Sequence, residues 1–180
     1  VTTEVVQNTK LKPKARAKII AYFIKLAMEL KALNNLNGVM EVVAGLSNAS
    51  VRRLKRAWAR VDSKLIAEFD SLKSLTSNHR AYAMLRNHIR ICKPPCIPYL
   101  GVHLTDLTFI EDGNDDQIDG GLINMVKRRM AANVIRDILQ YQHDSYPFEV
   151  SLPIAHYLVN MECKDDDACY DLSLLAEPRQ

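Results

Sequence analysis

Three polar side chains near the middle of the chain have a spacing that would place them on one face of a helix. Thr105, Thr108 and Asp112 stand at positions i, i+3 and i+7 of a segment that precedes Gly113. Residues with this spacing lie on the same side of an α-helix, so two hydroxyls and a carboxylate would form one polar edge. Such an edge can serve as a binding surface, but the same pattern is typical of an ordinary exposed helix face.

No other group of residues carries a recognisable catalytic pattern. The sequence contains no phosphate-binding glycine loop, no H-E-x-x-H zinc helix and no G-x-S-x-G nucleophile turn. The five histidines are scattered at no ligand spacing, and the four cysteines form no C-x-x-C pair. The acidic run at residues 165–167 fits a cation site or, more simply, the start of a helix, where the helix dipole favours carboxylates. We therefore expect no metal, no cofactor and no covalent chemistry.

The composition is that of one globular domain. Of the 180 residues 48% are hydrophobic and 25% are charged, with a net charge of +3. No apolar run approaches the ~20 residues of a membrane-spanning helix, and no secretory signal is visible, so free thiols and a cytoplasmic location are expected. Basic residues gather between Val51 and Arg60, which fits a solvated helix face or docking to an acidic partner. Without a nucleic-acid-binding motif, nucleic acid is the weakest interpretation of this charge.

Hydrophobic periodicity predicts helices along the whole chain. Pro13 opens an amphipathic helix over residues 14–33, because a proline costs nothing in the first turn. Further apolar stripes at helical spacing run through residues 39–46, 51–61, 65–72 and 82–89, and two last helices are expected near 152–160 and 165–175. The sequence therefore predicts an all-α protein, an irregular helical bundle that forms one unit over residues 1–180.

A protruding helical hairpin is expected between these helices. Prolines keep residues 93–98 extended, a short helix follows up to Gly113, residues 114–121 form an acidic loop, and a long helix returns over 122–142. We expect Leu100, Leu104 and Leu107 of the short helix to pack on the body of the protein, which leaves Thr105, Thr108 and Asp112 outside.

Several segments of the chain have recognisable motifs, of which the longest lie at the start of the hairpin. P-P-C-I-P-Y-L-G at residues 94–101 is followed by L-T-D-L-T-F-I-E-D-G-N at 104–114. These segments resemble the signature of the catalytic domains of Ras-family guanine-nucleotide exchange factors, the RasGEF or Son-of-sevenless-like family. The order and spacing of the matching segments agree over essentially the whole chain. The others are L-N-N-L-N-G-V-M-E-V-V at 33–43, V-R-R-L-K-R-A-W at 51–58, L-I-N at 122–124, K-R-R at 127–129, Y-Q at 141–142 and Y-D-L-S-L-L-A-E-P-R at 170–179.

The resemblance implies a protein that binds a Ras-family small GTPase and promotes GDP release by inserting the hairpin near the Mg²⁺ and phosphate site. By position, Thr108 would lie near the Mg²⁺ site and Asp112 would face the phosphate-binding groups, flanked by Thr105 and Asn114. No covalent bond is made or broken in such a reaction. A separate patch would hold the second switch segment of the GTPase, and it comprises Met40, Ser47, Arg52, Tyr82 and Tyr99.

The sequence departs from the family pattern in ways that keep alternatives open. The family usually has some tens of residues before the segment that residues 1–6 resemble, so the chain is expected to be the C-terminal two-thirds to three-quarters of the domain. Asp112 stands where the family usually has Glu, and Ser50 where it often has Pro, so exchange is expected to be slower. A non-catalytic or allosteric GTPase-binding module of the same fold is the first alternative, and an unrelated helical scaffold is the second.

Partner choice and location follow from the same resemblance. The F-I-E-D-G-N segment at residues 109–114 is more similar to exchange factors for Ras or Rap than for Ral. Neither nucleic-acid binding nor membrane insertion is expected, and regions outside this chain would recruit the protein to a membrane.

Overall fold

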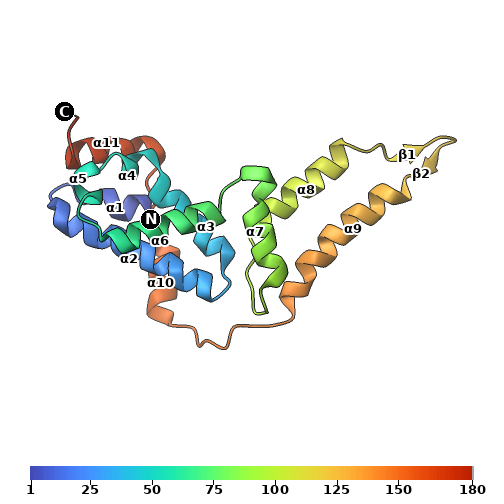
Figure 1. The fold of residues 1–180 in the computed structure, drawn as a ribbon, viewed down its shortest axis with the longest axis horizontal. Coiled ribbons are helices and arrows are strands. Elements are labelled where there is room, and N and C mark those ends of the chain that lie inside the picture. The colour runs from blue at the N-terminus through green and yellow to red at the C-terminus, as the bar shows by residue number, and fades with distance from the viewer. Residues whose placement is uncertain (180) are drawn as a thin grey trace.

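The computed structural model describes residues 1–179, and its helices divide into a body and a hairpin that projects from it (Figure 1). The α7 helix stands between the two parts. The body contains α1 (Thr2–Val6), α2 (Pro13–Ala32), α3 (Leu36–Ser47), α4 (Ala49–Arg52), α5 (Lys55–Trp58), α6 (Ser63–Leu75), α10 (Leu152–Asn160) and α11 (Asp166–Ala176). The remaining elements are α7 (His79–Ile91), α8 (Leu100–Asp112), β1 (Gln117–Ile118), β2 (Leu122–Ile123), α9 (Met125–Leu139) and the 3-10 turn η1 (Gln140–Gln142). The predicted all-α architecture is confirmed, with one very small sheet added.

Two hydrophobic clusters hold the molecule together. The first lies inside the body, where α2 contributes Ile20, Ile24 and Ala27, all fully buried. These residues recur every three or four positions, which places them on one stripe of the helix. The second cluster joins α7 and α8 to the start of α3, and its buried members are Leu36, Leu75, Leu85, Ile89, Cys96 and Val102.

The proline-rich segment that leads into α8 is attached to the body by backbone pairing. Ile97 accepts a hydrogen bond from Leu36 N–H at 2.9 Å and donates its own N–H to the Asn34 carbonyl at 3.0 Å. The Asn34 side chain also donates to the Lys93 carbonyl at 3.0 Å. This extended segment, predicted from its prolines, therefore fixes the start of the hairpin against the turn between α2 and α3.

The C-terminal helix closes the other end of the body. Asp165 caps α11 by accepting a hydrogen bond from Ala168 N–H at 2.8 Å, so the acidic run is the helix start that the sequence favoured. Beyond α11, the buried Glu177 carboxylate accepts the N–H groups of Arg56 and Ala57, each at 3.0 Å, at the start of α5. A carboxylate at a helix start satisfies N–H groups that have no partner inside the helix.

Two details of the predicted hairpin are wrong. The return helix begins at Met125 instead of Leu122, because Leu122–Ile123 pairs with Gln117–Ile118 as a short antiparallel ribbon. Gly120 and Gly121 make the tight turn of this ribbon, with φ of 81° and 76°, a backbone region that glycine adopts without strain. The predicted apolar stripe of α8 is also not a buried one, since Leu100 is 47% exposed and Leu104 is 59% exposed.

Among residues 1–179, no helix has the length and apolar character needed to cross a bilayer.

Candidate functional site

The outward face of α8 carries three of the residues singled out from the sequence. Thr105, Thr108 and Asp112 are all exposed on it. The Thr105 hydroxyl donates to the Gly101 carbonyl at 2.7 Å, and the Thr108 hydroxyl donates to the Leu104 carbonyl at 3.1 Å. Because these protons are used inside the helix, both oxygens present only lone pairs to a partner. Asp112 takes part in none of the ion pairs of residues 1–179, so its carboxylate is available.

Asn114 has a different place. Its side-chain amide donates to the Ile110 carbonyl at 2.9 Å and so satisfies one of the free carbonyls at the end of α8. The residue is half-buried and follows Gly113, past the last helical residue. The structure therefore brings the two threonines and Asp112 together, and uses Asn114 to end the helix that carries them.

Two large apolar side chains on the same face were not predicted as part of the site. Phe109 is 70% exposed and Leu104 is 59% exposed. They follow the pattern 104, 105, 108, 109 and 112, which covers one side of a helix. Solvent-exposed aromatic and aliphatic groups beside polar ones are typical of a protein-binding surface. The sequence did contain a signal for these two residues, because L-T at 104–105 and T-F at 108–109 are four positions apart and therefore lie on the same side of the helix.

The far end of the hairpin is held by a buried lysine. Lys127 on α9 is 3% exposed, and its ammonium lies 2.9 Å from Glu111 Oε1 and 2.9 Å from Asp116 Oδ1. These hydrogen bonds, first to Asp116 and then to Glu111, raise the pKa of Lys127, and the Lys127 hydrogen bond lowers the pKa of Asp116. The network ties α8, the loop and α9 together directly beside Asp112. Sequence reasoning noted Lys127 only within the K-R-R segment.

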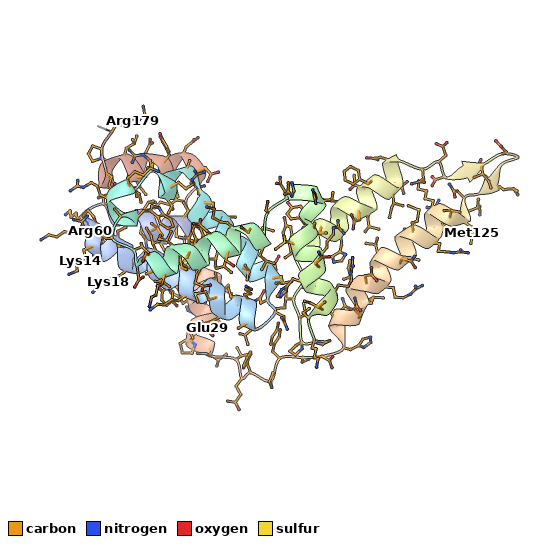
Figure 2. The ribbon with its side chains drawn as sticks, viewed as in Figure 1. Lys14, Lys18, Glu29, Arg60, Met125 and Arg179 are labelled. Atoms are coloured by element: carbon orange, nitrogen blue, oxygen red, sulfur yellow. The ribbon has the colours of Figure 1, made fainter. Side chains whose placement is uncertain are left out.

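Asn124 starts α9 and completes this arrangement. Its side-chain oxygen accepts the Lys127 N–H at 3.1 Å, and its amide donates to the Asp115 carbonyl at 2.9 Å. Asparagine is among the favoured N-cap residues. The return helix therefore begins at a fixed point, and Met125, its first residue, lies near the outer end of the hairpin (Figure 2).

At its inner end the hairpin is joined to α7 by a bidentate ion pair. Both terminal nitrogens of Arg86 lie 2.7 Å from the two carboxylate oxygens of Asp106 on α8. The Asp106 hydrogen bond raises the pKa of Arg86. Arg86 Nε also donates to the Ala81 carbonyl at 2.8 Å, inside a left-handed turn formed by Arg80, Ala81 and Tyr82. The ion pair thus links the hairpin to the turn that presents Tyr82.

The predicted partner-binding patch separates into two parts along α3. Met40, Tyr82 and Tyr99 pack together against the second cluster, with the two tyrosine rings 6.0 Å apart between centroids. Ser47 and Arg52 instead line a small hollow of about 250 Å³ beside Trp58, Phe69 and Lys73. Met40 and Ser47 are seven residues apart on α3, so they lie on one face of this helix and connect the two parts.

Comparison with known proteins decides the family. The RasGEF domain model matches residues 1–129, which run from α1 into the first turns of α9 and include all of α8. The chain belongs to the RasGEF domain family.

Curated relatives agree with this assignment over nearly the whole RasGEF chain. Ras guanine nucleotide exchange factor Y of Dictyostelium discoideum is 42% identical over 178 residues, which are 99% of this chain and 12% of the relative. Ras-specific guanine nucleotide-releasing factor 2 of Danio rerio is 39% identical over 166 residues, 92% of this chain and 13% of the relative. Ras guanine nucleotide exchange factor P of Dictyostelium discoideum is 39% identical over 180 residues, 100% of this chain. The chain thus spans only about an eighth of the length of relatives such as factor Y.

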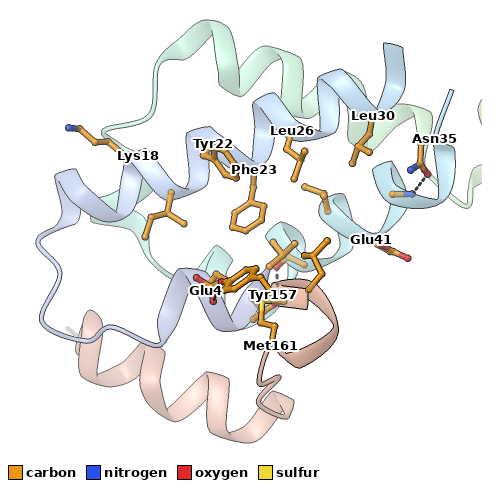
Figure 3. Close-up of a pocket in the computed structure, with 17 residues that line it drawn as sticks. Glu4, Lys18, Tyr22, Phe23, Leu26, Leu30, Asn35, Glu41, Tyr157 and Met161 are labelled. Atoms are coloured by element: carbon orange, nitrogen blue, oxygen red, sulfur yellow. Dashed lines mark hydrogen bonds between the residues drawn. The ribbon is translucent and has the colours of Figure 1, made fainter. Parts of the chain in front are cut away.

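A separate apolar groove crosses the body of the RasGEF chain, away from the hairpin (Figure 3). It has a volume of about 920 Å³ between α1, α2, α3 and α10, and Phe23, Leu26 and Leu30 of α2 line one side. Tyr157 of α10 closes the other side, and its hydroxyl donates to Glu4 at 3.5 Å. None of the predicted site residues lines this groove.

Proposed function

We propose that this chain is a guanine-nucleotide exchange factor, which binds a Ras-family small GTPase and promotes GDP release by inserting the α8–α9 hairpin near the Mg²⁺ and phosphate site. The observation that carries the proposal is the hairpin itself. It stands clear of the body (Figure 1) and exposes a helix face that ends in the carboxylate of Asp112. The membership in the RasGEF family and the names of the relatives, which are Ras exchange and releasing factors, support the same activity.

The chemistry needed for this activity is electrostatic and steric. A Ras-like GTPase holds its nucleotide through a phosphate-binding loop, a lysine and Mg²⁺. A carboxylate brought to these groups competes with the phosphates for the same cationic partners, and its negative charge repels the phosphates. Asp112 at the end of α8 would supply this charge. Because no bond of the nucleotide is broken, no acid, base or nucleophile is required.

The rest of the α8 face would exclude the metal and hold the partner. Thr108 lies one helical turn before Asp112 and would fill the space near the Mg²⁺ site. Phe109 and Leu104 would bury their exposed apolar surface against the GTPase, and burial of such surface stabilises a complex by about 25 cal/mol per Å² before the costs of association. These contacts would hold the GTPase on α8 while Asp112 acts on its nucleotide site.

The patch on the body would hold the second switch segment of the GTPase. Tyr82, Tyr99 and Met40 offer half-buried rings and a thioether, and Arg52 offers an exposed guanidinium. Tyrosine and arginine are enriched among the residues that dominate binding energy at interfaces. We propose two contacts on one partner, the hairpin at the nucleotide site and this patch at the second switch segment.

Stiffness of the hairpin supports its use as a wedge. Lys127 fastens the outer end of the hairpin, and the Arg86–Asp106 pair fastens its inner end.

Nucleotide and exchange factor affect each other's binding to the GTPase. If the exchange factor lowers the affinity of the GTPase for nucleotide, then nucleotide must lower the affinity of the GTPase for the exchange factor by the same factor. Incoming GTP would therefore displace the exchange factor and complete the cycle.

A release assay with fluorescent GDP on purified GTPases tests this function. The chain is expected to accelerate release from Ras or Rap more than from Ral, and a chain that leaves all three rates at the spontaneous value would contradict the proposal. The second candidate, a non-catalytic or allosteric GTPase-binding module, is favoured by the short Asp112 side chain. It predicts tight binding to nucleotide-free GTPase without any change in release rate.

A further inference from the structure

Two cysteines belong to the same hydrophobic cluster at the base of the hairpin. Cys92 directly follows the last residue of α7, and Cys96 lies four residues later in the extended segment that leads into α8. Cys96 is only 4% exposed, and Cys92 packs half-buried against the same hydrophobic cluster. Burial, together with contact with the Cys92 thiol, raises the pKa of Cys96 to about 12. The two cysteines thus share one cluster, and residues 1–179 contain no group of three or more His, Cys, Asp or Glu side chains able to hold a metal.

A small reagent can reach one of these thiols. Cys92 lines a hollow of about 560 Å³ at the junction of α7, α8 and the end of α9, and Pro94, Arg90 and Tyr141 border the same hollow. Cys96 is not among the residues that line it. A thiol that is open to solvent beside a buried partner thiol is the arrangement in which the first is oxidised and the second closes a disulfide.

We propose that Cys92 and Cys96 form a reversible redox site that takes hydrogen peroxide as oxidant and closes to an intrachain disulfide. The Cys92 thiol loses its proton, and the thiolate attacks one peroxide oxygen. The O–O bond breaks, Cys92 becomes a sulfenic acid, and the second oxygen takes up the released proton and leaves as water. The Cys96 thiol then loses its proton and attacks the Cys92 sulfur, the S–S bond forms and the S–O bond breaks, and the leaving hydroxide takes up that proton as a second water. Two thiols are oxidised and one peroxide is reduced to two waters.

The disulfide would alter the joint that carries the hairpin. In the reduced chain the Cys92 thiol donates to the Ile89 carbonyl at 3.2 Å, at the last turn of α7. Closing the bond replaces this contact and fixes the end of α7 to the segment that precedes α8. Tyr141, just after α9, packs against the same cluster. The site thus lies where α7, α8 and α9 meet, and the inference does not rest on the proposed exchange activity.

Peroxide treatment followed by iodoacetamide and mass spectrometry tests the site. Trypsin does not cut before proline, so both thiols stay on one peptide, residues 91–127. The exposed Cys163 is first replaced by Ser to remove a competing thiol. In this background we expect the peptide to lose two hydrogens, to resist alkylation completely, and to regain both alkylation sites after dithiothreitol.

Single replacements decide between a disulfide and other oxidation. Cys92→Ser and Cys96→Ala should each abolish the loss of two hydrogens, while circular dichroism shows an unchanged helix content. If Cys96→Ala does not fold, Cys92→Ser alone decides, because its side chain is only half-buried. The proposal is overturned if both cysteines stay open to alkylation at a peroxide concentration that oxidises Cys163 in the parent chain. It is equally overturned if either folded variant still loses two hydrogens.

Discussion

Arg86 on α7 and Asp106 on α8 form a bidentate ion pair with two 2.7 Å contacts, and this pair joins the hairpin to α7. Paired N–H···O bonds of this kind fix geometry as well as contributing energy. The same arginine reaches the turn before Tyr82. One side chain therefore couples the two surfaces that we propose to bind the GTPase.

Asp106→Asn should destabilise the protein and loosen the hairpin. The amide keeps the shape of the carboxylate but removes its charge. The two side chains are 32% and 30% exposed, so solvent screening places the cost nearer about 1 kcal/mol than the 3 kcal/mol of a fully buried charged hydrogen bond. Urea unfolding measures this cost, and Asp144→Asn, an exposed change in the tether after η1, is the control. Equal stability of the two variants would contradict a structural role for the pair.

Lys127→Met should open the outer end of the hairpin while the body stays folded. Glu111 and Asp116 would face each other without their cation, and like charges repel. Hydrogen–deuterium exchange should then rise over residues 111–127 and stay unchanged in α2. Arg129→Met is a suitable control, since Arg129 is exposed on the same helix and takes part in none of the described ion pairs. Unchanged protection in the Lys127 variant would mean that the network does not hold the hairpin.

The same network should respond to pH at both extremes. The pKa of Asp116 is lowered in the folded chain, so its stabilisation is present above the unfolded value near 4 and is lost as pH falls through the folded value. The pKa of Lys127 is raised, so its stabilisation is present below the unfolded value near 10.4 and is lost as pH rises through the folded value. Protection of the hairpin should be flat between roughly pH 5 and 9. A midpoint near neutrality would contradict this assignment.

Phe109→Ala should weaken GTPase binding with little effect on stability. The ring is 70% exposed, and exposed substitutions usually change the free energy of unfolding by no more than about 0.5 kcal/mol. If the ring anchors the partner, its loss should raise the Kd for nucleotide-free GTPase by about tenfold, or 1.4 kcal/mol. Phe148→Ala changes an equally open ring, 63% exposed, in the tether after α9. Identical affinities for the two variants would remove Phe109 from the interface.

Tyr82→Ala tests the patch on the body separately from the hairpin. We expect the Kd for nucleotide-free GTPase to rise by about tenfold to a hundredfold, in the range of interface hot spots. Tyr82 also packs on the second cluster, so thermal unfolding must be recorded in parallel. Tyr22→Ala is the control, because Tyr22 is 62% exposed on α2 and lies away from the patch. Unaltered affinity in a stably folded Tyr82 variant would rule out the patch.

Much of the fold was accessible from the sequence because apolar spacing and prolines determine local structure directly. Pro13 does open α2, and the prolines after Cys92 do keep the chain extended. The prediction that the leucines of α8 pack on the body of the protein was wrong. A leucine repeat predicts a helix, but it does not show which other part of the protein lies beside that helix. Leu104 projects into solvent since the hairpin stands clear, and that depends on contacts made far along the chain.

Only part of the site could be predicted, because some of its residues depend on contacts between segments that are distant in the sequence. The face of Thr105, Thr108 and Asp112 follows from helical spacing alone, so it could be anticipated. Lys127 could not, because its burial depends on Glu111 and Asp116 meeting it across the hairpin. The split of the patch likewise depends on where α7 places Tyr82, which a left-handed turn and Arg86 decide. The roles of all these residues in exchange remain predictions.

Release of fluorescent GDP from Ras by the Asp112 variants measures the central claim most directly. Asp112→Ala should slow catalysed release by at least about tenfold, which corresponds to 1.4 kcal/mol of lost transition-state stabilisation. Asp112→Glu should match or exceed the parent rate, because the charge returns with a longer reach. Asp119→Ala, which removes an exposed carboxylate from the turn of the same hairpin, should leave the rate unchanged. If Asp112→Ala releases GDP as fast as the parent chain, the carboxylate of α8 does not act on the nucleotide site.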